Sequence, residues 1–273
     1  MPRLPFLLGL VVLVFTGLIF IAPANGQTPT NRFAFGDFLL SPVRVHLLSA
    51  KDSPAIQTTL TEKDITRILQ KVNGVWSQAG LHFYLESLVR EEAQGQKLYT
   101  PTAEGTYQLA LLGLRPTESR ATNLFHIYYL KEMPNNGIYF PAAIFVKDTA
   151  SLRKVEGGID EPLPRVTSHE LGHAFSLSHR QDNTNLMASG TTGTRLNEEE
   201  ISQAREAARK FNWIQAAPDL MEKADALFRA GNVTNAAILY SRLATIPLSA
   251  DQVKLAKKRI AQATRTDSNS TVK

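Results

Sequence analysis

The sequence predicts a mixed α/β (α+β) domain followed by a small all-α extension. Four segments have the alternating apolar pattern of β-strands, at 43–50, 81–89, 123–130 and 138–146. Between and after them, apolar residues recur at the three- and four-residue spacing of helices. Beyond about residue 213 the chain becomes rich in alanine, and its apolar positions again have helical spacing. We therefore expect a domain over 43–212 and a helical extension over 213–264.

The composition is that of a globular protein and excludes several classes of function. Of 273 residues, 43% are hydrophobic and 20% are charged, and the formal net charge is +5. Because the basic residues are scattered and no dense Lys/Arg run with interleaved aromatic residues occurs, we expect no nucleic-acid partner. The chain has no cysteine, which excludes a disulfide scaffold, a thiolate metal ligand and a cysteine nucleophile.

The first 26 residues have the pattern of a secretory signal peptide. Arg3 precedes a nearly unbroken apolar run from Leu4 to Ala22, and the small residues of Ala22-Pro23-Ala24 follow. This order predicts an exported protein, either secreted or periplasmic. The apolar run is also nearly long enough to span a bilayer, so an uncleaved membrane anchor over residues 4–22 is the alternative.

Within the domain, each expected element has its own signal. Residues 27–42 are polar and turn-rich, and we expect a short exposed leader. A helix is predicted from Thr61 to the stop signal at Gly80, with an apolar face made of Ile65, Ile68, Leu69, Val72, Val75 and Trp76. Pro141 lies inside the 138–146 strand, which predicts an edge strand because proline cannot donate to a ladder. A helix capped by Asn197 closes the domain over 197–212.

The extension reads as two helices that turn at Gly231-Asn232, with a third from about Ser249. The spacing of its small and apolar residues resembles one tetratricopeptide-type unit. A single unit buries its own face poorly, so we expect it to dock on the preceding domain or on the third helix, and it offers a surface for a protein partner. Residues 265–273 are predicted to be disordered.

The segment "SHELGHAFSLSH" at 168–179 holds three of the six histidines. On a helix, His169 and His173 lie one turn apart on the same face, so both imidazoles can hold one ion. Glu170 points about 100° away and lies beside that ion, where it can take a proton from metal-bound water. If the helix ends near Ser176, His179 can return as the third ligand. Three histidines with one open position are typical of a single catalytic Zn²⁺.

These residues resemble the metzincin clan of zinc endopeptidases, whose motif H-E-x-x-H-x-x-G-x-x-H is followed by a methionine-containing turn. The resemblance covers roughly 43–212 and is to the small, matrixin-like members. It implies a zincin fold with a mixed twisted sheet and an active-site helix. By this resemblance His169, His173 and His179 are the metal ligands, Glu170 is the general base, and Met187 in "NLM" lies beneath the metal.

The sequence departs from the clan at one position, because Ser176 replaces the glycine that ends the helix in a sharp, often left-handed turn. A side chain in such a turn costs about 1 kcal/mol. The resemblance further implies that a polypeptide substrate pairs with the edge strand, at Ile138, Phe140, Ala142 and Ala143.

The predicted function is therefore an exported zinc metalloendopeptidase, a hydrolase. The alternatives are a metzincin-like binding protein without turnover, which acts through its helical extension, and a zinc amidohydrolase that acts on cell-wall peptides. Two further interpretations concern single residues. Glu198, Glu199 and Glu200 are rival third ligands, although helix capping explains them without a metal. The remaining histidines, His46, His82 and His126, are assigned to structure.

Overall fold

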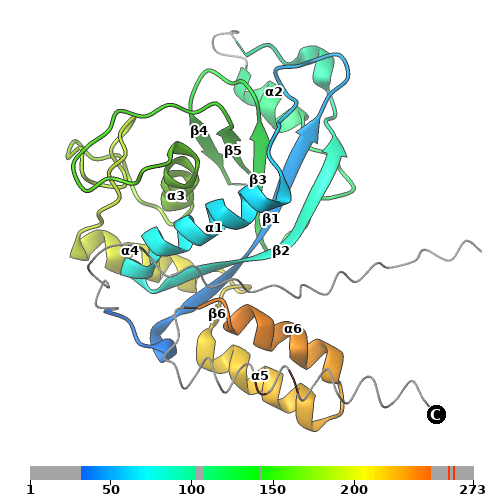
Figure 1. Cartoon of the computed structure of the whole chain (residues 1–273), viewed down its shortest axis with the longest axis vertical. Helices are drawn as coiled ribbons and strands as arrows, with labels where there is room; N and C mark the ends of the chain where they lie inside the picture. The colour runs from blue at the N-terminus through cyan, green and yellow to red at the C-terminus, as the bar shows by residue number, and fades with distance from the viewer. Residues whose placement is uncertain (1–31, 102–106, 142, 247–257, 259–260, 262–273) are drawn as a thin grey trace, which may run out of the picture. The chain divides into compact units, whose positions relative to one another are not determined.

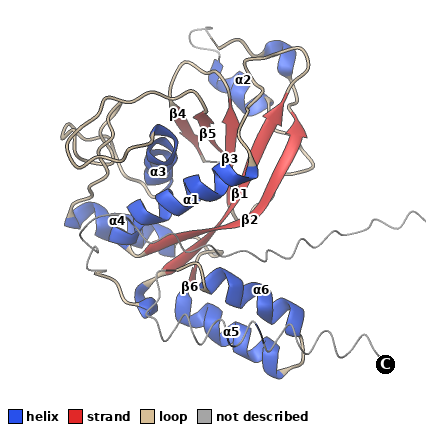
Figure 2. Ribbon diagram, viewed as in Figure 1, coloured by secondary structure: helices blue, strands red, loops and turns tan. Residues whose placement is uncertain are grey.

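The structure is a computed structural model that describes residues 32–101, 107–141, 143–246, 258 and 261. All of these residues belong to one compact unit, Asn31–Lys273. Its framework is a six-stranded mixed sheet with helices against both faces (Figures 1 and 2), which confirms the predicted fold class. The strands are β1 (Leu39–Ser49), β2 (Leu81–Glu92), β3 (Phe125–Leu130), β4 (Gly137–Phe140), β5 (Ala143–Lys147) and β6 (Gln215–Ala216).

The strand order is β2-β1-β3-β5-β4. β1 pairs in parallel with both β2 and β3, and β3 pairs in parallel with β5. β4 lies at the edge and runs antiparallel to β5, while the short β6 pairs antiparallel with the start of β1. The helices of the described residues are α1 (Glu62–Trp76), α2 (Tyr107–Gly113), α3 (Pro162–Ala174), α4 (Glu198–Arg209), α5 (Ala217–Arg229) and α6 (Val233–Leu243).

Helix α1 forms where the apolar spacing predicts it. Thr61 is the N-cap, its side chain accepts the backbone N–H of Asp64, and the Asp64 carboxylate accepts the Thr61 N–H in return. All six apolar residues of the predicted face are buried. The helix continues into a 3-10 turn, Ser77–Ala79, and ends at Gly80 with a φ of 60°, a left-handed conformation that glycine adopts without strain.

The sheet separates two apolar cores because successive strand residues face opposite sides. On one side, Ile127 and Tyr129 of β3 pack in a core with α1 and α3. On the other, Tyr128 and Leu130 of β3 pack with Leu111 of α2. The first core positions α3, the helix that carries the histidine motif, against the sheet next to β4 and β5.

The predicted single edge strand over 138–146 is wrong. This segment forms two antiparallel strands, β4 and β5, with Pro141 in the turn between them and Phe140 opposite Ala143. Only β4 lies at the edge, and β5 is buried between β3 and β4. The apolar pattern continues through both arms because both pack against the cores, which conceals the turn from a reading of periodicity.

The predicted exposed leader also ends earlier than residue 42. β1 begins at Leu39, four residues before the expected strand, and Phe38 is fully buried. Leu39 pairs with Leu81 of β2 on one side and with Ala216 of β6 on the other. Strands that are distant in sequence therefore extend β1 towards its N-terminal end.

The helical extension packs on the preceding domain, which is one of the two arrangements that we expected. Helices α5 and α6 turn at Gly231, which has a φ of 76°. Leu220 and Tyr240 from these helices share a core with Phe38 and Leu40 at the start of β1. The third predicted helix and the predicted disordered tail fall outside the described residues, apart from two positions.

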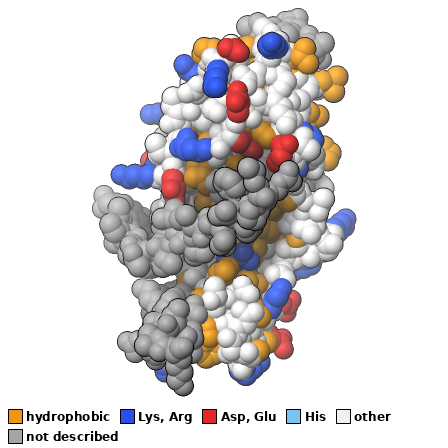
Figure 3. All heavy atoms as spheres, turned by 90° about the vertical axis from the view of Figure 1, so that its right-hand side faces the viewer, with side chains coloured by type: hydrophobic (Ala, Val, Ile, Leu, Met, Phe, Trp, Pro, Cys, Tyr) orange, Lys and Arg blue, Asp and Glu red, His pale blue; other side chains and the backbone are white. Residues whose placement is uncertain are grey.

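No helix of the described part of the chain has the length and apolar character needed to cross a membrane. The segment 1–26, predicted as a signal peptide or anchor, lies outside the described residues. On the face drawn in Figure 3, the described Lys and Arg side chains are interspersed with Asp and Glu.

Candidate metal centre

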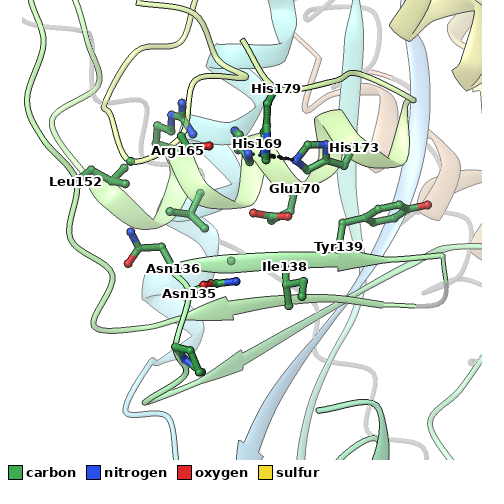
Figure 4. A pocket seen from close by; sticks show the side chains of 15 residues that line it. Asn135, Asn136, Ile138, Tyr139, Leu152, Arg165, His169, Glu170, His173 and His179 are labelled. Atoms are coloured by element: carbon green, nitrogen blue, oxygen red, sulfur yellow. Dashed lines mark hydrogen bonds between the residues drawn. The ribbon is translucent and has the colours of Figure 1, made fainter. Parts of the chain in front are cut away.

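Three histidine rings converge at the C-terminal end of α3. His169 and His173 lie one turn apart on this helix, and their Nε2 atoms are 3.2 Å from each other. The Nε2 atom of His179 lies 3.1 Å from that of His173. One ligand atom from each of the three residues lies within 4.8 Å of the others. The structure thus brings the three predicted ligands together, as Figure 4 shows.

His179 reaches this position because the chain reverses at Ser176. The helix ends at Ala174, and Ser176 has a φ of 66°, the only positive φ of a non-glycine residue in the described part of the chain. The N–H of Leu177 bonds the carbonyl of Gly172 at 2.9 Å, and the N–H of Ser176 bonds that of His173 at 3.0 Å. This is the Schellman arrangement of a helix C-terminus. Serine therefore makes the turn that the motif requires.

Backbone carbonyls fix the orientation and the tautomer of two rings. The Nδ1 atom of His169 lies 2.8 Å from the carbonyl oxygen of Leu186, and that of His173 lies 2.9 Å from the carbonyl oxygen of Leu177. Because a carbonyl only accepts, Nδ1 donates in both rings. In a neutral imidazole the Nε2 atoms are then unprotonated, and they face each other.

These unprotonated nitrogens fit a metal ion. The pKa of His169 is lowered to about 3, mainly by burial, and burial also lowers the pKa of His173. Both rings are therefore neutral at pH 7. Two lone pairs 3.2 Å apart repel unless a cation lies between them. Tetrahedral zinc with Zn–N distances of about 2.0–2.1 Å sets its nitrogen ligands roughly 3.3–3.4 Å apart. The donor set consists of imidazole nitrogen only, which zinc also accepts.

Glu170 is buried beside the histidines and points towards β4 (Figure 4). Burial raises the pKa of its carboxyl group to about 8, against the opposing effect of the Arg165 charge. The strand passes so close that a Cβ atom on Gly137 would lie 2.6 Å from Glu170 Oε1 and 2.6 Å from Val166 Cγ1. Gly137 is therefore part of the site. In the sequence it carries only the signal of the "NNG" turn.

Met187 is fully buried. A Cβ atom on Gly172 would lie 2.5 Å from Met187 Sδ, so the methionine contacts α3 where the helix has no side chain. Its neighbour Leu186 supplies the carbonyl that holds His169. Asn185 accepts the N–H of Met187 through its side-chain oxygen at 2.6 Å. The turn thus supports the histidine cluster from the protein interior.

The rival acidic ligands serve other purposes. Glu200 is buried and accepts hydrogen bonds from Arg180 Nε at 2.7 Å and from Asn185 Nδ2 at 2.8 Å, and it completes the capping box with Asn197. The side chains of Glu198 and Glu199 are 77% and 82% exposed. None of the three belongs to the metal-ligating group found among the described residues.

A cavity of about 760 Å³ opens beside the cluster. Gly137, Ile138 and Tyr139 of β4 border it on one side, and α3 borders it on the other. Of the predicted substrate-binding residues, Ile138 lines the cavity and Phe140 does not. Ala143 lies buried in β5 and does not line it either. Ala142 falls outside the described residues. The other cavity residues, which the sequence did not single out, are Pro134, Asn135, Asn136, Leu152, Arg165, Val166, Ser189 and Gly190.

The histidines assigned to structure lie away from the cavity. His46 and His126 are buried on β1 and β3, and His46 Nε2 lies 2.8 Å from His126 Nδ1. His82 is buried on β2, and its Nε2 lies 2.8 Å from Thr245 Oγ1 at the end of α6.

No family model matches the chain, and no curated protein matches it in sequence. Among solved structures it is similar to archaemetzincin from Methanopyrus kandleri, with 13% identity, a TM-score of 0.43, and coverage of 64% of this chain and 97% of that one. It is also similar to metalloproteinase-II from Bacteroides fragilis, with 12% identity, a TM-score of 0.40, and coverage of 64% and 55%. A zinc-dependent peptidase from Methanocorpusculum labreanum matches with 11% identity, a TM-score of 0.28, and coverage of 62% and 100%. At such low identities, a function for this chain has to be argued from its own site.

Proposed function

We propose that this chain is a zinc-dependent endopeptidase of the metzincin kind, which hydrolyses peptide bonds with Glu170 as general base. One observation carries the proposal: three imidazole rings, two of which have an unprotonated Nε2 atom, converge beside a buried carboxyl group in an open cavity. Three nitrogen ligands leave a fourth position of a tetrahedral ion free, which is typical of catalytic rather than structural zinc.

His169, His173 and His179 would hold one Zn²⁺ ion through their Nε2 atoms. When bound, Zn²⁺ polarises a carbonyl oxygen and lowers the pKa of water to about 7. The carbonyl groups of Leu186 and Leu177 orient two of the rings, and such supporting contacts strengthen metal binding. The chain therefore supplies a preorganised set of nitrogen donors.

Glu170 would move the proton. Its carboxylate takes a proton from the attacking water as the water oxygen bonds to the scissile carbonyl carbon, and it passes this proton to the nitrogen of the leaving amine as the C–N bond breaks. Glu170 is 5% exposed, and its carboxyl group faces β4 across the cavity. A carboxylate in such a poorly hydrated place is a stronger base than one in water.

The substrate would lie extended between α3 and β4. β4 is an edge strand whose only partner in the described sheet is β5, so its outer edge can pair with a peptide backbone. Ile138 and Tyr139 of this strand line the cavity and can contact substrate side chains. Binding through backbone hydrogen bonds favours an endopeptidase, because it requires extended chain on both sides of the cleaved bond.

The cellular setting is also part of the proposal. The pattern of residues 1–26 supports export, with an uncleaved anchor over 4–22 as the alternative. The similarity of α5 and α6 to a tetratricopeptide unit and a partner for 213–264 remain predictions.

The test is a digest of a defined peptide library by the purified full-length chain, with cleavage sites read by mass spectrometry. The zinc-loaded protein should cut internal bonds, and removal of zinc by a chelator should abolish the cuts. Glu170→Gln should keep its zinc and lose at least about 100-fold in kcat/KM, the range of general-base catalysis. Glu199→Gln, which changes a carboxylate that is 82% exposed, is the matched control and should cleave normally.

A folded, zinc-loaded wild-type protein that cuts none of the peptides would contradict the proposal and favour the binding-protein alternative. That alternative depended on Ser176, and the structure shows this serine in the left-handed turn with its hydrogen bonds made. Cleavage confined to cell-wall peptides in a parallel digest would instead indicate the amidohydrolase.

A further inference from the structure

Arg165 is a buried cation at the end of the cavity. The residue lies on α3 one turn before His169, is 2% exposed and borders the cavity (Figure 4). Its Nε donates to the carbonyl of Gly193 at 3.0 Å, and its Nη2 donates to the carbonyls of Asn185, at 3.4 Å, and Ala188. These bonds attach α3 to the loop that contains Met187.

No carboxylate of the described residues forms an ion pair with Arg165. The guanidinium donates to the backbone carbonyls of Gly193, Asn185 and Ala188, which satisfy donors without neutralising the charge. A buried charge without a counter-ion is costly, and natural proteins pair such charges. Burial lowers the pKa of Arg165 only to about 10, so the guanidinium is charged at neutral pH.

Apart from Glu170, no residue that lines the cavity beside Arg165 can carry a negative charge. Asn135, Asn136 and Ser189 are neutral, and Val166 and Leu152 provide apolar surface. The charge of Glu170 raises the pKa of Arg165 through space, but the Glu170 side chain points towards β4. A dication held by the three histidines would add further positive charge, so the cavity would attract anions.

We infer that Arg165 is a specificity-determining residue that receives a carboxylate of the substrate. This rests on the proposed peptidase function. Arg165 precedes His169 by four positions of α3, which is a rise of about 6 Å. An extended peptide advances about 3.3 Å per residue, so the carboxylate belongs to a residue one or two positions from the scissile bond. Either an acidic side chain or a free C-terminal carboxylate supplies this chemistry.

The test compares matched peptides with the zinc-loaded full-length protein. In the first pair, a long, end-blocked peptide carries either Glu or Gln near the scissile bond. This residue is placed in turn at each of the two positions on either side of the bond. A second pair ends two residues beyond the bond in a free carboxylate or an amide. At one position the carboxylate peptide should be cleaved with about 10- to 100-fold higher kcat/KM, because charge-assisted hydrogen bonds are the strong ones. The two pairs distinguish the side chain from the chain terminus.

The variant Arg165→Met should cleave both peptides of a pair with equal kcat/KM. Any effect of the variant on overall activity cancels, because the two peptides are compared with the same protein. Arg205→Met is the matched control. Arg205 also donates to backbone carbonyls, those of Ala79, Gly80 and Asp37, but it lies outside the cavity. This variant should keep the wild-type ratio. Arg165→Lys retains the charge and should retain part of the ratio if Arg165→Met does not fold.

Equal cleavage of both members of each pair by the wild-type protein would overturn the inference while leaving the peptidase intact. So would a ratio that survives in Arg165→Met, because Arg165 would then only hold the loop. If no peptide is cleaved, the proposed function fails. In that case, binding of the same labelled pairs to the zinc-loaded protein, followed by fluorescence anisotropy, decides the inference on its own: tighter binding of the carboxylate peptide that is lost in Arg165→Met supports it, and equal binding refutes it.

Discussion

Gly137 determines how closely β4 approaches the general base, so the substitution Gly137→Ala tests the geometry of the site. The added Cβ would lie 2.6 Å from Glu170 Oε1 and 2.8 Å from its Cγ. Ordinary contact begins at 3.4 Å, so the carboxyl group or the strand must move by roughly 1 Å. Val166 Cγ1, also 2.6 Å from the new atom, blocks the alternative direction. A misplacement of about 1 Å costs about 100-fold in rate.

We therefore expect kcat/KM of Gly137→Ala on an internally cleaved peptide to fall about 100-fold, which is about 2.7 kcal/mol of transition-state stabilisation. Bound zinc should remain at the wild-type level, because the atoms nearest to the added Cβ belong to Glu170 and Val166 and not to the histidines. The matched control is Gly74→Ala on the exposed side of α1, where a Cβ meets nothing within 4 Å; it should keep full activity. Wild-type activity in Gly137→Ala, or loss of zinc from it, would refute this reasoning.

Three further predictions concern stability. Ser176→Gly should raise the free energy of unfolding by about 1 kcal/mol in urea titrations, because Ser176 has a φ of 66° and glycine tolerates this conformation; a lower stability would contradict it. Burial lowers the pKa of His82 to about 4. Between about pH 6.5 and pH 4 this histidine is therefore protonated in the unfolded chain and neutral in the folded chain. Stability from this group is therefore complete above pH 6.5 and should fall by roughly 1.4 kcal/mol per pH unit between pH 6 and 4, and His82→Gln should flatten that slope in unfolding curves. Removal of zinc should lower Tm, since a ligand at 1,000 times its Kd adds about 4 kcal/mol; an unchanged Tm in calorimetry after zinc is added back would argue against a folded-state site.

Local patterns predicted the parts of the fold and the site that depend on short spacings. The face of α1 follows from its apolar positions and the cap at Thr61, and the one-turn separation of His169 and His173 follows from helix geometry. The return of His179 could also be predicted, because only a turn near Ser176 brings it back.

Features that depend on distant contacts could not be read from the sequence. The turn at Pro141 is hidden because both arms of the hairpin are apolar. The roles of Gly137 and Arg165 arise from contacts with residues at least 20 positions away in the sequence. The early start of β1 depends on pairing with β6, more than 170 residues later in the chain.

The central claim is that one zinc ion on His169, His173 and His179 makes this chain a peptidase. The most direct measurement is a zinc titration of the metal-free full-length protein, with bound zinc and peptide cleavage followed in the same samples. The account predicts that both rise together and reach a plateau at one equivalent of zinc, and that His173→Ala removes both while His82→Gln removes neither. Tight binding of one equivalent without cleavage, or cleavage by the metal-free protein, would contradict it.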